Sequence, residues 1–158
     1  MKHQSGFNLI EMILVILIIG ILVATALPRL ANVAADARFA KMNALASSLK
    51  TSATMAHGQS LAEQLFASSS ITLEDGTIVA MSGFYPDATT SGIIATFDNY
   101  GITSGVTNGT KVVFFPDEAH AAAGTCEVAY YPANIGAAYP SKVPFIDTTG
   151  ISSVANCN

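Results

Sequence analysis

One carboxylate in this chain stands in an apolar setting where a charge needs a partner. Glu11 is the only charged residue in the apolar run at residues 7–27. It is the fifth residue of that run, roughly 7 Å along a helix. A charged side chain at the centre of a membrane helix costs about 2.5–3.5 kcal/mol, and less near a helix end. A partner of opposite charge relieves that cost, so ion pairing is the chemistry expected of Glu11. The alternative is an unpaired acid that reaches back to the membrane interface.

Cys126 and Cys157 are the two cysteines of the chain. Two cysteines in an exported domain favour a single disulfide, because disulfides form and persist in oxidising compartments. Such a bridge would close a loop of about 32 residues and contribute roughly 3.5–4 kcal/mol of stability in the chain-entropy treatment. The alternative is two unpaired thiols.

The remaining residues that often carry chemistry do not form a recognisable site. They are His3, His57, His120, the acidic pair Glu74 and Asp75, and the acidic pair Asp117 and Glu118. The histidines lack metal-ligand spacing, and surface or helix-end positions are expected for them. The acids lie in predicted turns and are expected to be solvated. The sequence has no nucleophile elbow, phosphate-binding loop or dinucleotide fingerprint. It therefore predicts no enzyme, no metal site and no cofactor.

Charge and composition exclude a further class. The 158 residues carry a net charge of −4, and no cluster of lysine and arginine follows Lys50. Binding to nucleic acid through its phosphates needs basic patches, so a nucleic acid partner is not expected. Beyond Pro28 the chain is polar, has no Trp and has few charges, which indicates a small secreted domain.

The element that carries Glu11 is long enough to span a membrane. Its 21 residues would form roughly 31 Å of helix, close to the hydrocarbon thickness of about 30 Å. Ala24 and Ala26 resemble a signal cleavage site, but the apolar run is too long for a secretory signal and helix-forming sequence continues through it. Lys2 places the N-terminus in the cytoplasm, so the rest of the chain is expected outside it.

A second helical segment follows at residues 29–56. The apolar positions expected to face a globular domain are Ala35, Phe39, Met42, Leu45, Leu49, Ala53 and Ala56. The positions expected on the other side are Asn43, Ser47, Lys50 and Thr54. Gly58 is expected just past the helix end. Pro28 removes the bond to the carbonyl of Ala24 and should bend the axis, and Gly20 is a second weak point.

The remainder predicts an α+β fold, with the long helix covering one face of a small antiparallel sheet. The expected elements are a short helix at 60–66 capped by Ser60, a hairpin at 71–80 around Asp75 and Gly76, a short helix or loop at 90–100, a turn at Asn108 and Gly109, and strands at 111–115 and 126–131. The tail at 133–158 shows little regular structure. The predicted organisation is a leader at 1–6, a membrane helix at 7–28, an amphipathic helix at 29–58 and a head at 59–158.

The N-terminus resembles that of type IV prepilins. The matching residues are Gly6 and Phe7, Leu9, Ile10 and Glu11, the run Ile19, Gly20, Ile21 and Leu22, and Pro28. The resemblance is dense over about the first 30 residues and departs at Asn8, where the family more often has Thr. It implies that a prepilin peptidase cleaves between Gly6 and Phe7 on the cytoplasmic side. It also implies that the new Phe7 amine is N-methylated.

The resemblance further implies roles in assembly. Glu11 would pair with the free Phe7 amine of a neighbouring subunit and set the axial register. The segment from Gly20 to Pro28 would lose helicity in the filament and let it stretch. A disulfide between Cys126 and Cys157 would bound a variable surface loop.

The function that the resemblance implies is that of a structural subunit of a type IVa-like pilus. Identical subunits would be polymerised by assembly machinery in the inner membrane into an extracellular filament for attachment, motility or aggregation. Motifs at 83–86, 112–115 and 126–133 resemble the mannose-sensitive haemagglutinin branch. The alternatives are a pseudopilin of a type II secretion system and a monomeric membrane-anchored binding domain. The second alternative leaves Glu11 without a role.

Overall fold

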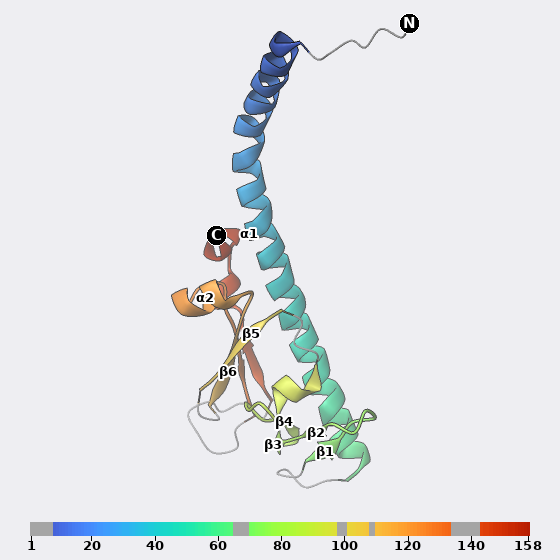
Figure 1. The fold of residues 1–158 in the computed structure, drawn as a ribbon. Coiled ribbons are helices and arrows are strands. Elements are labelled where there is room, and N and C mark those ends of the chain that lie inside the picture. The colour runs from blue at the N-terminus through green and yellow to red at the C-terminus, as the bar shows by residue number, and fades with distance from the viewer. Residues whose placement is uncertain (1–7, 65–69, 98–100, 108–109, 134–142) are drawn as a thin grey trace, which may run out of the picture.

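A single helix of 54 residues, α1 (Leu9–Ala62), dominates the fold. The computed structural model describes residues 8–64, 70–97, 101–107, 110–133 and 143–158. Figure 1 shows that the N-terminal half of α1 projects away from a small head, while its C-terminal half lies along that head. The α+β fold predicted from the sequence is confirmed: one long helix packs on small antiparallel sheets.

The face of α1 that packs on the head is the one predicted from the apolar periodicity. Six of the seven predicted positions are buried, and Phe39 is partly buried against the same core. The opposite positions are all exposed; they are Asn43, Ser47, Lys50 and Thr54. Helical spacing therefore located the contact surface correctly, because one apolar stripe on a helix can face only one neighbour.

The predicted end of this helix at Gly58 is wrong, and so is the separate helix predicted to begin at Ser60; its last residues, 65 and 66, lie outside the described residues. α1 continues to Ala62 and ends at Glu63, with Gln64 in the left-handed region at φ 53°. Ser60 is an interior residue whose hydroxyl donates to the carbonyl of His57 at 2.8 Å. Tertiary contacts carry the helix past the glycine, whose intrinsic cost is only about 1 kcal/mol.

The main sheet has four antiparallel strands in the order β5-β6-β7-β8. The strands are β5 (Thr103–Thr107), β6 (Lys111–Phe115), β7 (Val128–Tyr131) and β8 (Phe145–Asp147). The prediction of β6 is confirmed in full. β7 begins two residues later than predicted, because Cys126 has a φ of 53° that an extended strand does not allow. The sequence did not predict β5. β8 was not predicted either, so the described part of the tail, 143–158, contains more regular structure than expected.

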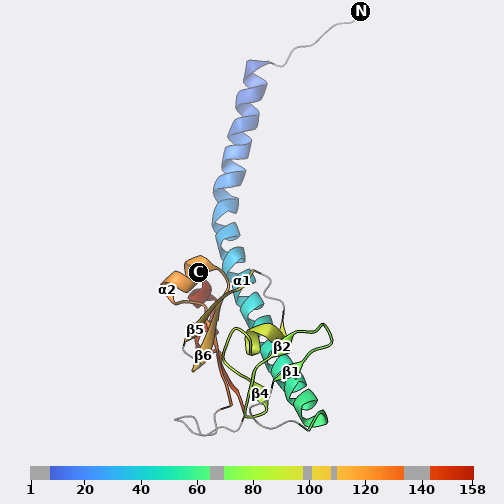
Figure 2. The same ribbon diagram turned by 60° about the horizontal axis from the view of Figure 1, so that its bottom comes forward.

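Two small hairpins pack against the C-terminal end of α1 (Figure 2). The strands are β1 (Ile71–Thr72), β2 (Ile78–Val79), β3 (Met81–Ser82) and β4 (Tyr85–Pro86). The predicted hairpin around Asp75 and Gly76 is confirmed, with Gly76 at φ 85° and the Asp75 carboxylate accepting from the backbone N–H of Thr77 at 2.8 Å. That backbone hydrogen bond holds the pKa of Asp75 below its ordinary value. A 3-10 helix, η1 (Ile93–Thr96), follows at the position predicted as helix or loop.

The core lies between α1 and the main sheet. Met42, Leu45 and Leu49 of α1 join the fully buried Phe114 and Tyr130 of the sheet in one cluster. The hydroxyl of Tyr130 donates to the carbonyl of Pro86 at 2.7 Å, which ties the main sheet to β4. Burial raises the pKa of Tyr130 well above its usual range.

A short helix and the C-terminal segment complete the head. Helix α2 (Glu118–Ala123) follows β6, and the 3-10 helices η2 (Thr149–Ile151) and η3 (Val154–Cys157) end the chain. The predicted disulfide between Cys126 and Cys157 is confirmed, with their Cα atoms 4.7 Å apart and both side chains fully buried. It joins η3 to the residues that lead into β7, beside α1. The predicted turn at Asn108 and Gly109 lies outside the described residues.

We expect the double substitution of Cys126 and Cys157 to Ser to lower the free energy of unfolding by roughly 3–4 kcal/mol. The bridge restricts the unfolded chain, and its loss also leaves η3 held only by side-chain contacts. Urea unfolding of the full chain in detergent, followed by tyrosine fluorescence, measures the change. Addition of a reductant should shift the wild-type curve and leave that of the double variant unchanged. Identical stability of the two oxidised proteins would contradict the prediction.

Candidate functional site

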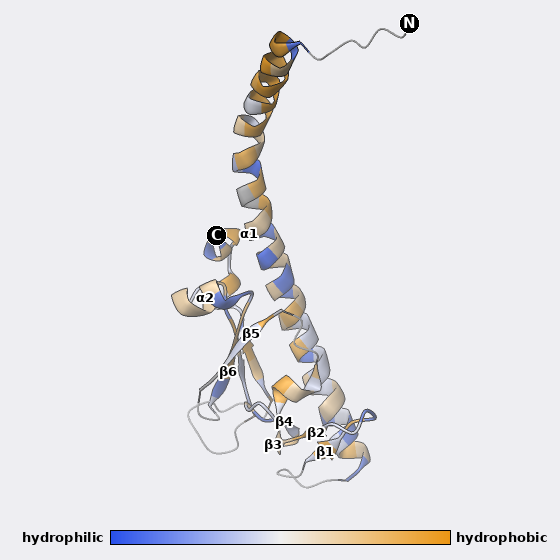
Figure 3. Cartoon of the chain, in the orientation of Figure 1, coloured by the Kyte–Doolittle hydropathy of each residue, from blue (hydrophilic) through white to orange (hydrophobic). Residues whose placement is uncertain are grey.

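The projecting half of α1 is an apolar surface that no other described part of the chain covers. Its large apolar side chains are between 41% and 73% exposed from Leu9 to Val33. Figure 3 shows this half almost entirely in the hydrophobic colours. A stretch of 18 residues in α1 has a mean hydropathy of 2.9, and none of it is buried within the subunit. The length and composition of this helix therefore allow it to cross a membrane. Such a surface is stable only in lipid or against another protein.

Glu11 lies in the first turn of this apolar helix, as predicted. Its backbone N–H bonds the carbonyl of Asn8 at 3.0 Å, and its carboxylate is exposed. Asn8 occupies the N-cap position without a side-chain hydrogen bond. Among the described residues Glu11 has no ion pair or side-chain hydrogen bond. The helix dipole favours an acid in this turn, but by at most about 1 kcal/mol at an exposed site. No described group of this subunit therefore occupies the carboxylate.

The predicted processing residues, Gly6 and Phe7, lie outside the described residues. Cleavage between them and methylation of Phe7 remain predictions. The described chain begins at Asn8, directly before the helix that carries Glu11.

Gly20 and Pro28 lie within an unbroken helix in the single subunit. A Cβ placed on Gly20 would meet no atom within 4 Å, so packing inside this subunit does not require a glycine there. α1 continues through Pro28, although proline has no N–H to bond the carbonyl of Ala24. The hydroxyl of Thr25 donates to the carbonyl of Leu22 at 2.9 Å, a bond of the kind that bends helices. The loss of helicity in a filament remains a prediction.

The head carries a polar cluster that joins α1, α2 and η3. Arg38 of α1 donates to the carboxylate of Asp117 at 3.1 Å and to the carbonyl of Cys157 at 3.4 Å. The other Asp117 oxygen lies 2.6 Å from Nδ1 of His120, and the backbone N–H of His120 donates to the same oxygen at 3.0 Å. An ionised carboxylate only accepts, so Nδ1 carries the proton.

The two predictions at this cluster are confirmed only in part. Asp117 lies in a bend and its side chain is 38% exposed, as expected of a turn residue, but it is also the N-cap of α2 and forms an ion pair. His120 lies in the last turn of α2, which agrees with a helix-end position, but it is buried, with only 7% of its surface exposed. The signal was present in the sequence, because an aspartate and Gly124 bracket the alanine-rich segment as an N-cap and a left-handed C-cap. The salt bridge to Arg38 could not be predicted, since the two residues are 79 positions apart.

The same contacts set the ionisation of Asp117. The side chain of His120 and then its backbone N–H hydrogen-bond the carboxylate, and the nearby Arg38 adds a positive charge. Together they lower the pKa of Asp117 from 3.8 to about 2. When Asp117 is ionised, the cluster therefore links α1, α2 and η3.

Nothing in the described ranges resembles a catalytic or metal centre. His57 is half-buried at the end of α1, where Nδ1 lies 3.0 Å from the carbonyl of Phe84 and the ring stacks on Tyr85 with 4.2 Å between centroids. Within these ranges no group of three or more histidine, cysteine or acidic residues could hold a metal ion. The feature that calls for a function is the projecting helix.

Comparison with known proteins addresses that helix directly. Residues 1–27 match the family described as the prokaryotic N-terminal methylation motif. The chain is also 39% identical over 89 residues to a fimbrial protein of Moraxella nonliquefaciens, which covers 56% of this chain and 55% of that protein. It therefore spans about half the length of that relative. No solved structure gives a significant match.

These similarities confirm the predicted resemblance to type IV pilins. They point to a structural fimbrial protein and not to an enzyme. Membership of the mannose-sensitive haemagglutinin branch is not addressed by either of them and stays a prediction.

We expect stability at acid pH to depend on Asp117. Its folded pKa of about 2 lies below the ordinary 3.8, so its contribution is complete above about pH 4 and is lost as the pH falls towards about 2. Asp117→Asn keeps an N-cap acceptor but removes the charge, so it should be less stable than the wild type at neutral pH. The difference should close between about pH 4 and pH 2.

Thermal unfolding of the full chain in detergent across this pH range measures the effect. Glu118→Gln removes an exposed carboxylate one residue away and should follow the wild type throughout. A gap between Asp117→Asn and the wild type that persists unchanged to pH 2 would contradict the assignment.

Proposed function

We propose that this chain, which carries the N-terminal methylation motif and resembles type IV pilins, is a structural subunit of an extracellular type IVa-like pilus. The observation that carries the proposal is the projecting half of α1, an exposed apolar helix interrupted by one carboxylate that has no partner among the described residues. A membrane anchor needs the apolar surface alone. A helix that must also align with identical copies has a use for the charge.

Processing precedes assembly in this proposal. The leader with Lys2 keeps the N-terminus in the cytoplasm, and the apolar helix holds the precursor in the inner membrane as a single pass. Prepilin peptidase removes residues 1–6 on the cytoplasmic side, and the new Phe7 amine is methylated. The head then lies outside the cytoplasm, where the disulfide between Cys126 and Cys157 can form.

Assembly transfers the apolar helix from lipid to a bundle of identical helices. Lipid tails are as apolar as these side chains, so close packing and specific polar contacts must favour the bundle. The Phe7 amine of one subunit and Glu11 of its neighbour supply such a contact, because opposite charges attract strongly in an apolar interior. A Cβ placed on Gly20 would meet no atom within 4 Å, and a glycine at this position allows a second helix to approach closely.

The head forms the outer surface of the filament. Its core holds the C-terminal half of α1 rigidly, and the disulfide fixes the end of the chain. Surface attachment, motility and aggregation are the activities we propose for this surface, by analogy with pili.

We expect Glu11→Ala to insert and to be processed, yet to form no filaments. The substitution makes the helix more apolar, so insertion is unimpaired, but it removes the partner of the Phe7 amine. Quantification of the chain in sheared surface material and in the membrane fraction measures the outcome. Glu118→Ala, which removes an exposed carboxylate from the head, should assemble normally. Filaments of Glu11→Ala at the wild-type level would overturn the assigned role.

Intact mass and N-terminal sequencing of the sheared material test the proposal as a whole. A chain that begins at N-methylated Phe7 in that fraction is the expected result. The same processed chain confined to the inner membrane would instead indicate a pseudopilin of a secretion system. A chain that still begins at Met1 would leave only a membrane-anchored domain.

A further inference from the structure

Two opposite charges on α1 have no partner within the described subunit. Arg29 lies just beyond the apolar half, and Asp36 lies where the helix reaches the head; both are exposed. In the described part of the chain neither side chain takes part in a hydrogen bond or an ion pair. They are seven residues apart, beyond the three- or four-residue spacing at which side chains pair within one helix.

Three basic side chains along the head contact other groups of the subunit. Arg38 binds Asp117, and Lys41 donates to the carbonyls of Gly101 and Pro116. Lys111 lies 6.0 Å from the centre of the Tyr131 ring. Arg29 differs from these three residues, because it lies on the projecting half of α1 and its guanidinium has no partner among the described residues.

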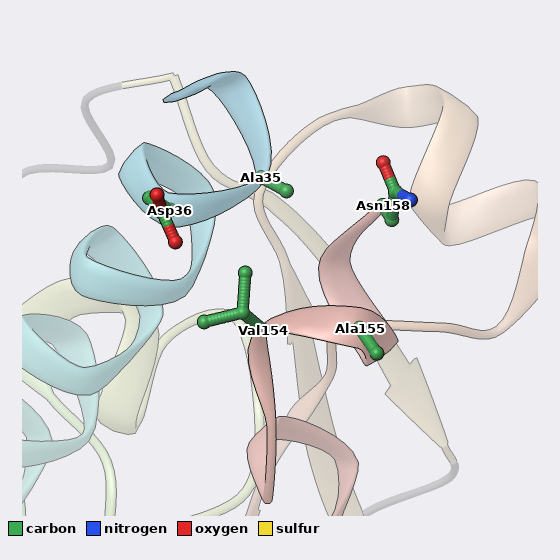
Figure 4. A pocket seen from close by; sticks show the side chains of 5 residues that line it. All are labelled: Ala35, Asp36, Val154, Ala155 and Asn158. Atoms are coloured by element: carbon green, nitrogen blue, oxygen red, sulfur yellow. The ribbon is translucent and has the colours of Figure 1, made fainter. Parts of the chain in front are cut away.

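A hollow lies beside Asp36, between α1 and η3. It has a volume of about 340 Å³, and its lining residues are Ala35, Asp36, Val154, Ala155 and Asn158. Figure 4 shows the Asp36 carboxylate at one side and the Asn158 amide at the other, with the small apolar side chains between them. This arrangement suits an arginine, whose aliphatic stem packs on methyl groups while its guanidinium donates to a carboxylate and an amide oxygen.

The spacing of the two charges suits a second copy of the same chain. Seven residues correspond to roughly 10 Å along α1, and to a rotation within about 20° of two full turns. Arg29 and Asp36 therefore lie on nearly the same face. In a helical assembly every copy has the same orientation relative to its neighbours, so a contact between two copies repeats along the assembly.

We propose that Arg29 of one copy docks in the hollow beside Asp36 of an adjacent copy displaced by roughly 10 Å along the helix axis. The inference rests on the proposed filament and adds a second register contact, outside the apolar segment. Each copy offers one Arg29 and one hollow, so the contact is head-to-tail and continues without closing. The displacement has the same sense as the one that brings the Phe7 amine of a neighbour towards Glu11.

Charge reversal tests this contact. Arg29→Glu and Asp36→Arg should each lower the amount of sheared filament at least about tenfold, because each places like charges together. The double exchange, Arg29→Glu with Asp36→Arg, should restore filaments to within about threefold of the wild type. Glu118→Arg, a reversal on the exposed face of α2, is the matched control and should assemble normally. N-terminal mass confirms that all variants are inserted and processed.

Cysteine cross-linking supplies an independent readout. The double variant Arg29→Cys with Asp36→Cys should yield a ladder of disulfide-linked oligomers from assembled material. Each single cysteine variant, and Arg29→Cys combined with Glu118→Cys, should give no ladder. Peptide mapping verifies that Cys126 and Cys157 remain joined to each other.

The outcomes separate this inference from the proposed function. Normal filaments from the single reversals, or single-variant losses that the double exchange does not rescue together with no ladder, would overturn the Arg29 contact and leave the pilus subunit intact. Failure of the wild type to appear in any surface filament would overturn both. Rescue by the exchange and a ladder specific to the Arg29 and Asp36 positions would establish the contact.

Discussion

An apolar helix that its own subunit does not cover is the constraint on which the rest of the structure depends. Water cannot be the final environment of the large apolar residues between Leu9 and Val33, because they remain largely exposed in the single subunit. A bilayer satisfies this helix before assembly, and identical helices satisfy it afterwards. The backbone suits both environments, since an α-helix bonds its own polar groups. The remaining features either hold the head to this rod or specify how rods align.

The head packs on one face of the C-terminal half of α1. The stripe of Met42, Leu45 and Leu49 packs on Phe114 and Tyr130, so one side of the helix is used up inside the subunit. Arg38 and Asp117 then join the helix to α2 by charge, and the disulfide holds η3 beside it. Gly150 of η2 lies so close to Glu127, the residue before β7, that a Cβ on Gly150 would overlap the Glu127 backbone. η2 therefore packs tightly against the residues that lead into β7. The exposed side of the rod is left for other molecules.

Polar groups on this exposed side can specify the axial alignment of neighbouring helices, which apolar packing alone does not. Leucine and isoleucine side chains pack acceptably at many axial offsets, whereas a charge finds its partner at one offset. Glu11 within the apolar segment and the pair of Arg29 and Asp36 near the head are therefore separate determinants of alignment. Their positions at the two ends of the projecting segment would fix both the register and the tilt of neighbouring rods.

The sequence by itself determined the features that depend on local periodicity and composition. The apolar run, the lone Glu11, the buried stripe of α1, the hairpin at Gly76 and strand β6 all follow from side-chain spacing and turn chemistry. The disulfide followed because only two cysteines were present. Tertiary structure decided the rest: the helix past Gly58, strands β5 and β8, the tie between Arg38 and Asp117, and the hollow beside Asp36. These features join residues far apart in the chain, and their free energy comes from contacts that no local pattern encodes.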